Sequence, residues 1–349
     1  MPAFNEEVGI AAAVRSLSES NYPDVEVVVV DDGSTDATAE AVNSLALPNV
    51  RLIRQANAGK AEALNTGIRL ARNDVIVTVD GDTVFEPDTI RWLVQPFTDP
   101  IVGAVSGNTK VGNRGGMLGR WQHIEYVLGF NLDRRMYDLL GCMPTVPGAI
   151  GAFRRDVLDE LGGVSSDTLA EDTDLTMAII RAGWRVVYEQ RAIAWTEAPA
   201  SLSELWKQRY RWSYGTMQAM WKHRGSTRDG SPLGRRALPY LLFFQILLPL
   251  LAPVVDLFTV FGIFFLKPGP LIAYWVAFNA VTLALALFAF RLDQESARPL
   301  WALPLQQFVY RQLMYLVVIQ STVTAVLGTR LHWHKLERTG DVQLPVEST

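Results

Sequence analysis

The sequence has a single cysteine, Cys142, among its 349 residues. One cysteine excludes an intrachain disulfide framework and a cysteine-rich zinc site, and it fits a reducing compartment. Long basic runs are absent and the net charge is −4, so we expect no nucleic-acid partner. We also expect no signal peptide, because Met1 is followed at once by Pro-Ala-Phe-Asn-Glu-Glu. The sequence contains no internal repeat and no low-complexity segment.

Hydrophobic residues are abundant but unevenly distributed. They make up 49% of the chain, charged residues make up 19%, and the mean hydropathy is +0.13. Roughly the first 200 residues have a globular composition, whereas the last third is an almost continuous series of Leu, Phe, Val and Ala. The length suggests about two domains, and the composition indicates that one of them is strongly apolar.

The first third of the chain alternates between predicted helices and predicted strands. Short runs rich in β-branched residues are typical of buried parallel strands, and they occur at Val25–Val30, Val50–Arg54 and Val75–Val79. A helix is predicted over Val8–Ser20, where apolar residues recur with helical spacing. This alternation predicts an α/β domain with a parallel sheet.

Acidic residues follow two of these strands directly. Asp31 and Asp32 precede Gly33, and Asp80-Gly81-Asp82 follows the third strand. The carboxyl ends of parallel strands are where α/β sheets bind ligands, although Asp31-Asp32 is also compatible with an ordinary acidic turn. Two carboxylates as close as Asp80 and Asp82 can bind Mg²⁺ or Mn²⁺, which prefer oxygen ligands and neutralise a diphosphate.

Two glycine-containing segments lie between the predicted elements. Gly59-Lys60 leads into a helix without the spacing of a nucleotide-binding P-loop, so Lys60 is either a ligand contact or an exposed lysine. The segment 148–155 contains small residues that let the backbone approach a ligand. Further strands are predicted at Val102–Gly107, Thr109–Val111 and Trp184–Tyr188, and helices at Met117–Leu140 and Leu202–His223.

Two polar motifs stand in the second half of the predicted α/β region. Glu171 and Asp172 open an apolar helix, where carboxylates are favoured by the helix dipole even without another role. Farther along, helical spacing places Gln208, Arg211 and Trp212 on one face. An arginine suits phosphate oxygens and an indole suits the apolar side of a sugar ring.

Three apolar runs complete the chain, at Leu238–Phe265, Leu271–Phe290 and Leu300–Leu327. Each is long enough to span a bilayer, which needs about 20 residues. Asp256 within the first run is a functional hint, and the polar residues of the third run indicate a polymer path or a helix–helix contact. Three spans would place the C-terminal tail opposite the catalytic domain, whereas its basic residues (330–338) favour the cytoplasm; both topologies remain open.

The order of these motifs resembles the processive membrane glycosyltransferases of family 2, which include the synthases of cellulose, chitin, hyaluronan and poly-N-acetylglucosamine. The segment Trp206-Lys207-Gln208-Arg209-Tyr210-Arg211-Trp212 is most similar to the poly-N-acetylglucosamine synthases. The chain departs from the family in having Ala170 where the family has threonine before Glu-Asp. The family's first β-strand and its upstream membrane helices are apparently missing before Pro2.

The resemblance implies a fold and a location. We expect a GT-A domain, Rossmann-like and nucleotide-sugar-binding, over residues 1–200, with an interface helix containing the Q-x-x-R-W motif over 201–236. An α-helical transmembrane region of about three helices would follow over 237–328, and a polar tail over 329–349. The protein would be integral to the plasma membrane with a cytoplasmic catalytic domain.

The resemblance also assigns roles to individual residues. Asp172 would be the general base, with Glu171 as its catalytic partner. The expected nucleotide-sugar-binding residues are Pro2, Ala3, Asp32, Lys60, Asp80, Gln208 and Arg211. The expected acceptor-binding residues are Trp212, Gly148 and Arg154. Asp82 and Asp80 would hold Mg²⁺ or Mn²⁺.

The function implied is inverting transfer of a sugar, N-acetylglucosamine above all, from a UDP-sugar to a growing polysaccharide, coupled to translocation across the membrane. Hyaluronan-, chitin- and glucan-type synthases are the alternatives. A nucleotide-sugar-binding membrane subunit with impaired catalysis is an alternative from another class. A transporter is disfavoured because the acidic motifs lie in the soluble half. The expected partners are the UDP-sugar donor, the polysaccharide acceptor, the lipid bilayer and an accessory membrane subunit.

Overall fold

The computed structural model describes residues 1–328 of the chain. Its N-terminal part contains a parallel sheet in the order β1 (Pro2–Ala3), β2 (Val27–Asp32) and β3 (Val50–Gln55). Four consecutive valines open β2, and all six residues of this strand are buried. β2 therefore continues beyond the predicted end at Val30 and includes both aspartates, which places them at the carboxyl end of the sheet.

The strand that we expected to be missing is present as a short edge strand. Pro2 and Ala3 of β1 pair in parallel with Val30 and Asp31 of β2. A proline is tolerated here because an edge strand leaves one side of its backbone without a ladder partner. Two residues are too few to produce a periodic pattern, so the strand was not recognised from its sequence.

Helices α1 (Ile10–Ser18), α2 (Thr38–Ser44) and α3 (Lys60–Leu70) flank this sheet. Ile10, Val14 and Leu17 share one face of α1 and pack in one cluster with Val27 and Val29 of β2. This helical spacing of apolar residues is what buries the helix against the strands.

A second sheet of five strands lies beside the first and has the order β4-β7-β6-β8-β5. Its strands are β4 (Val75–Thr78), β5 (Val84–Phe85), β6 (Val102–Val111), β7 (Gly151–Arg154) and β8 (Arg185–Thr196). The two short strands predicted at 102–107 and 109–111 form one strand, β6. Its pairing with β8 shifts register between Gly107 and Asn108, so the chain bends there without leaving the sheet.

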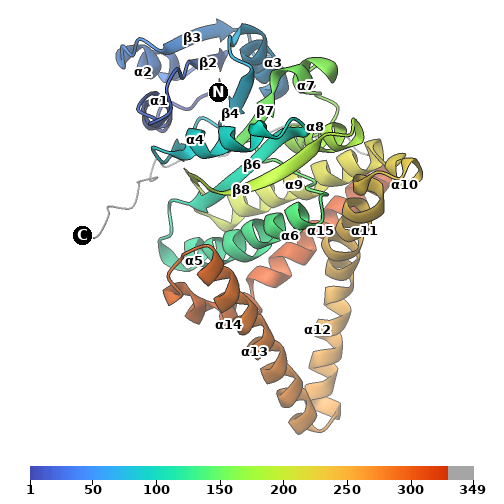
Figure 1. Cartoon of the computed structure of the whole chain (residues 1–349). Coiled ribbons are helices and arrows are strands. Elements are labelled where there is room, and N and C mark those ends of the chain that lie inside the picture. Colours follow the sequence, from blue (N-terminus) through green and yellow to red (C-terminus); the bar gives the residue numbers. More distant parts are fainter. Residues whose placement is uncertain (329–349) are drawn as a thin grey trace.

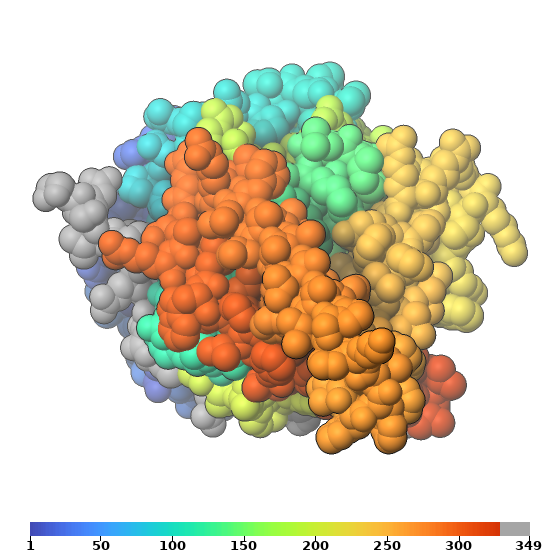
Figure 2. Space-filling view, turned by 90° about the horizontal axis from the view of Figure 1, so that it is seen from below, coloured from blue at the N-terminus to red at the C-terminus, as the bar shows by residue number. Residues whose placement is uncertain are grey.

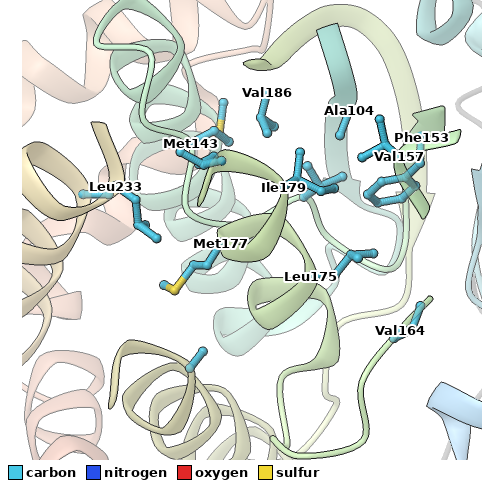
Figure 3. Close-up of a cluster of buried hydrophobic side chains, with 14 of the residues drawn as sticks. Ala104, Met143, Phe153, Val157, Val164, Leu175, Met177, Ile179, Val186 and Leu233 are labelled. Atoms are coloured by element: carbon cyan, nitrogen blue, oxygen red, sulfur yellow. The ribbon is translucent and has the colours of Figure 1, made fainter. Parts of the chain in front are cut away.

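The core between this sheet and the C-terminal helices is apolar (Figure 3). Ile179 and Leu175 of α8 (Glu171–Arg181) lie in one cluster with Phe153 and Ala104 of the sheet. Leu233, from the segment that leads to the membrane helices, belongs to the same cluster and is fully buried. The helix that begins with Glu171 and Asp172 is therefore fixed from both sides. Short helices α4 (Thr89–Val94) and α7 (Arg155–Glu160) complete this part of the fold.

Two long helices lie below the five-stranded sheet. The helix predicted over 117–140 consists of α5 (Gly116–Glu125), a π-helical segment η2 (Tyr126–Leu132) and α6 (Asp133–Leu139). The predicted amphipathic helix at 202–223 is α9 (Leu202–Lys222), whose N-terminus is capped by the Ser201 hydroxyl.

The C-terminal part contains two helices long and apolar enough to cross a membrane, Leu233–Phe265 and Pro268–Leu292. The first comprises the segment η3 (Leu233–Ala237), α11 (Leu238–Tyr240), η4 (Leu241–Leu247) and α12 (Leu248–Phe265), and the second is α13 (Pro268–Leu292). In each of these helices, only 6% of the most apolar 18-residue stretch is buried inside the protein. In Figure 1 α12 and α13 form a hairpin that extends away from the sheets. Seen from below, the orange atoms of α13 and the following segment cover part of the underside of the molecule (Figure 2).

The third predicted membrane span is not a continuous helix. The run from 300 to 327 is divided into η5 (Arg298–Ala302), α14 (Leu303–Gln306) and α15 (Tyr310–Leu327). Prolines begin the first two of these segments, because proline fits the first turn of a helix but not its interior. α15 carries Arg311 and Gln312 and packs against α9 and α12. Two helices, rather than three, therefore qualify as spans among the described residues, and the basic residues 330–338 lie outside the described part.

The turn that follows α13 joins the α12–α13 hairpin to the second sheet and the helices below it through two carboxylates with little exposure. Asp293 accepts hydrogen bonds from the side-chain amides of Asn108 (2.9 Å) and Asn131 (3.0 Å). Glu295 forms ion pairs with Lys110 and Arg114, each at 2.9 Å. The Glu295 side chain is only 9% exposed. These contacts hold the hairpin at a fixed position beneath β6 and α5.

We predict that Glu295→Gln destabilises the folded protein by about 3 kcal/mol or more, because two cations stay buried without their carboxylate. The matched control is Asp159→Asn, which changes an exposed acid of α7 and should alter stability by about 0.5 kcal/mol at most. Thermal unfolding of both variants in detergent tests this. Equal unfolding midpoints for the two variants would show that the Glu295 contacts do not hold the hairpin.

Candidate functional site

A cavity of about 460 Å³ lies at the junction of the second sheet, α8, α9 and the α5–α6 helix. It is lined by most of the residues expected to act together, although they come from five separate parts of the chain. The predicted site residues that line it are Lys60, Asp80, Asp82, Gly148, Glu171, Asp172, Gln208, Arg211 and Trp212.

Lys60 lies at the start of α3 and connects two of the acidic motifs. Its Nζ is 2.9 Å from Asp80 Oδ1 and 2.9 Å from Glu171 Oε1. Burial alone lowers the pKa of the Lys60 ammonium, but the charges of Asp80 and Glu171 outweigh burial and raise it. Lys60 therefore stays positively charged and holds a strand end and a helix start together.

The position of Lys60 depends on Asp32 and on two glycines. Asp32 accepts hydrogen bonds from the backbone N–H groups of Ala58 (3.0 Å) and Gly59 (2.8 Å), which fixes the loop before α3. Gly59 has φ +93°, a conformation that favours glycine. A Cβ atom on Gly148 would lie 2.8 Å from Lys60 Nζ, so a larger residue at position 148 would displace the end of the lysine side chain.

Asp172 has the environment of a general base. Its carboxylate accepts hydrogen bonds from Thr173 N (2.7 Å) and Gly148 N (3.2 Å) at the N-terminus of α8. Burial and the neighbouring Glu171 charge raise the pKa of Asp172 to about 6, while Lys60 opposes them. A carboxylate that titrates near 6 is a stronger base than an ordinary aspartate and is still mostly ionised at neutral pH.

Asp80 and Asp82 place hard oxygen atoms on the cavity wall. Asp82 is buried and accepts a hydrogen bond from the Thr83 hydroxyl at 3.1 Å. Within residues 1–328, no group of three or more His, Cys, Asp or Glu side chains is arranged to hold a metal ion alone. Two carboxylates fit the kind of Mg²⁺ site that takes its remaining ligands from substrate phosphates and water.

Helix α9 supplies a basic and aromatic wall. Arg211 and Trp212 line the cavity, and among residues 1–328 the Arg211 side chain has no hydrogen-bonding partner. Trp212 is half-buried, with its ring 5.8 Å from that of Phe130 and nearly perpendicular to it. The Arg209 guanidinium lies 4.4 Å from the Trp212 ring centre, which fixes the indole by a cation–π contact.

Arg209 and its partners were not predicted as site residues. Arg209 is buried, forms an ion pair with Glu125 of α5, and donates to the Gln208 side-chain oxygen at 2.5 Å. Glu125 also accepts a hydrogen bond from the Tyr310 hydroxyl at 2.6 Å. The helical spacing of Gln208 and Arg211 predicts that these two side chains share one face. No pattern in the sequence indicates that Arg209 contacts α5.

Four predicted residues do not line the cavity. Pro2, Ala3 and Asp32 lie at the carboxyl end of the first sheet, on the other side of the loop that leads to Lys60. The position of Arg154, outside the cavity lining, does not support the expected acceptor role. Its guanidinium donates to the backbone oxygens of Phe97, Asp99 and Val102, because Arg154 ends β7 beside the start of β4, at the end of that strand opposite to Asp80.

Comparison with known proteins identifies the family of the chain. A sequence model of the family described as "Glycosyltransferase like family 2" matches residues 1–215. The chain is 30% identical over 254 residues to the poly-beta-1,6-N-acetyl-D-glucosamine synthase of Staphylococcus aureus (strain COL), covering 72% of this chain and 61% of the relative. The Staphylococcus epidermidis synthase is 30% identical over 250 residues, 70% of this chain and 59% of that protein. The chain thus spans about three-fifths of the length of these relatives.

A solved structure has a similar fold. The mannosyltransferase PcManGT from Pyrobaculum calidifontis, in complex with GDP-Man and Mn²⁺, superimposes with a TM-score of 0.67 at 24% identity, covering 94% of this chain and 86% of that one. This likeness supports the GT-A fold expected from the sequence, and the resemblance drawn from the motifs is confirmed. The chain belongs to the family 2 glycosyltransferases.

Proposed function

We propose that the protein transfers N-acetylglucosamine from UDP-N-acetylglucosamine to the end of a growing polysaccharide, with inversion at the anomeric carbon. The observation that carries the proposal is the Asp172 carboxylate, which shares one cavity with Lys60, the Asp80/Asp82 pair and the Q-x-x-R-W wall of α9. The choice of sugar is supported by the similarity to the two staphylococcal synthases.

The donor occupies the part of the cavity next to the first sheet. Lys60 and Arg211 supply positive charge for the diphosphate, and Arg211 has its guanidinium available for phosphate oxygens. Asp80 and Asp82 hold a divalent cation, which offsets the negative charge of the diphosphate when bound. Pro2, Ala3 and Asp32, beyond the Lys60 loop, contact the uridine.

Asp172 acts on the acceptor. Ionised at neutral pH, it accepts the proton of the acceptor hydroxyl as the oxygen attacks the anomeric carbon, and the nucleoside diphosphate leaves from the opposite face. Lys60 holds Glu171 beside this base, so Glu171 keeps its position while contributing the negative charge that raises the pKa of Asp172. Gln208, fixed by Arg209, borders the same space.

The acceptor occupies the part of the cavity bordered by Trp212 and Gly148. From there the lining continues to apolar residues of η4 and α15, namely Leu241, Ile246, Met314, Val317 and Val318. We propose that the polysaccharide leaves in this direction, between helices that lie in a plasma membrane, with the catalytic domain (1–200) and interface helix (201–236) on the cytoplasmic side. An accessory membrane subunit would contact the region 237–328.

The donor is tested by measuring nucleoside diphosphate release from UDP-N-acetylglucosamine, UDP-glucose, UDP-glucuronate and GDP-mannose by the membrane-embedded full-length gene product. We expect the highest rate with UDP-N-acetylglucosamine. Faster release from another donor would change the product to a glucan- or hyaluronan-type polymer. Binding of a donor without any release would favour the non-catalytic subunit instead.

Asp172→Asn should leave UDP binding almost unchanged and lower the rate of transfer by about 10²–10⁴-fold, the usual contribution of a positioned general base. The amide keeps the size of the side chain but cannot take a proton. Calorimetric titration with UDP and a transfer assay measure the two effects separately. A loss of UDP affinity as large as the loss of rate would make Asp172 a nucleotide ligand.

Asp82→Asn should abolish turnover and remove the dependence of UDP binding on Mg²⁺ or Mn²⁺, because a neutral amide replaces an anionic metal ligand. The measurement is UDP affinity with and without each cation, for the wild type and the variant. The metal role is wrong if wild-type UDP affinity does not change when the cation is removed by a chelator.

Trp212→Ala should shorten the product while donor binding stays near normal, because it removes an apolar surface for the acceptor sugar and leaves Asp82 and Arg211 in place. Hydrolysis of the donor by water should rise relative to transfer. The alternative is that Trp212 only anchors the interface helix, as aromatic residues do at membrane borders. In that case a stable Trp212→Ala protein would make polymer of normal length.

A further inference from the structure

The helix formed by α5, η2 and α6 presents one row of side chains to the cavity. Tyr126, Phe130, Asp133 and Tyr137, spaced by three or four residues, all line it. The row passes through the π-helical segment 126–132, and such segments occur frequently at functional sites. Asp133 is the one acid in this row, and the proposed chemistry gives it no role.

Asp133 is a carboxylate for which the fold provides no partner. Among residues 1–328 it makes no hydrogen bond and no ion pair closer than 4.0 Å. Burial raises its pKa to about 7, and the neighbouring Arg134 charge only partly opposes this. The Arg134 guanidinium instead donates to the Asn131 side-chain oxygen at 3.2 Å.

A second polar group nearby is also unsatisfied. Tyr137 is 4% exposed, and its buried hydroxyl has no hydrogen-bonding partner among the described residues. The α9 wall of the cavity offers Met217 and Met220, whose side chains cannot donate a hydrogen bond. Leaving a buried polar group such as the Tyr137 hydroxyl without a partner costs about 1–3 kcal/mol. Together with the half-buried, unpaired Asp133 carboxylate on the same helix face, it points to a ligand that would satisfy both groups.

The position of Asp133 in the cavity indicates which kind of ligand it would bind. Its neighbour Arg134 lies close enough to Asp172 to feel the charge of that carboxylate. Tyr137, one turn beyond, has its ring 5.2 Å from that of Tyr240 at the start of the first membrane helix. Asp133 therefore lies between the proposed base and the membrane helices, where a bound polymer would pass on its way from the reacting end.

We propose that Asp133 is a specificity residue for the acceptor, which accepts a hydrogen bond from a hydroxyl or amide N–H of a polymer sugar behind the reacting end. The inference rests on the proposed function, since it names the group that recognises the acceptor of that reaction. Tyr137 lies one helical turn away and offers its hydroxyl to the same sugar.

The test uses the full-length protein in nanodiscs, with UDP-N-acetylglucosamine as donor and short N-acetylglucosamine oligosaccharides as added acceptors. Asp133→Leu should raise the acceptor KM about tenfold or more, the value of one hydrogen bond to a charged group, with a smaller change in kcat. Asp133→Asn keeps an acceptor oxygen and should recover part of this loss, and Tyr137→Phe should have a smaller effect. The control Met136→Leu, on the same helix but outside the cavity lining, should leave the acceptor KM unchanged.

Thermal stability separates this role from a structural one. Because Asp133 has no partner within residues 1–328, Asp133→Leu should unfold at the same or a higher temperature than the wild type in the absence of ligand. A lower unfolding temperature for both Asp133 variants, or an unchanged acceptor KM in folded Asp133→Leu, would overturn the inference. If the wild type releases no nucleotide from any donor, the proposed function fails instead, and the stability result still reports on Asp133.

Discussion

The site depends on one half-buried cation between two carboxylates. Lys60, at the start of α3, pairs with Asp80 from the end of a strand and with Glu171 from the start of α8. Without it, three acids would face one another in a space of low dielectric, where like charges repel strongly. The lysine therefore favours the ionised form of Asp172, and the glycine at 148 leaves room for the end of the lysine side chain.

The rest of the fold divides the space around this ion-pair cluster into a donor part and an acceptor part. In the proposed reaction the Asp80/Asp82 pair borders the donor part, and α9 and the α5–α6 helix, which line the same cavity, border the acceptor part. Asp293 and Glu295 fix the α12–α13 hairpin against β6 and α5. The apolar helices are thereby held beside the cavity, whose lining includes residues of η4. This position connects the proposed reaction site with the proposed path of the polymer through the membrane.

Sequence reasoning predicted the part of the site that depends on local patterns. Asp80 and Asp82 follow the end of a β-branched run, as expected, and line the cavity, but that strand, β4, lies in the second sheet and pairs antiparallel with β7 rather than continuing the parallel sheet. Features that depend on tertiary packing were not predictable: Arg154 faces backbone carbonyls, and the helix after 300 is broken. Asp133 went unnoticed because an acid on a mainly polar helical stretch is ordinary until its neighbours are known.

The pH dependence of kcat/KM for the donor, at saturating acceptor, tests the central claim most directly. A base whose pKa is raised is protonated, and inactive, below that pKa. The account therefore predicts a rate that rises tenfold per pH unit on the acid side and levels off above an apparent pKa of about 6. This acid limb should persist in Asp133→Asn. A rate that is constant down to about pH 4, the usual range of an aspartate, would contradict the account.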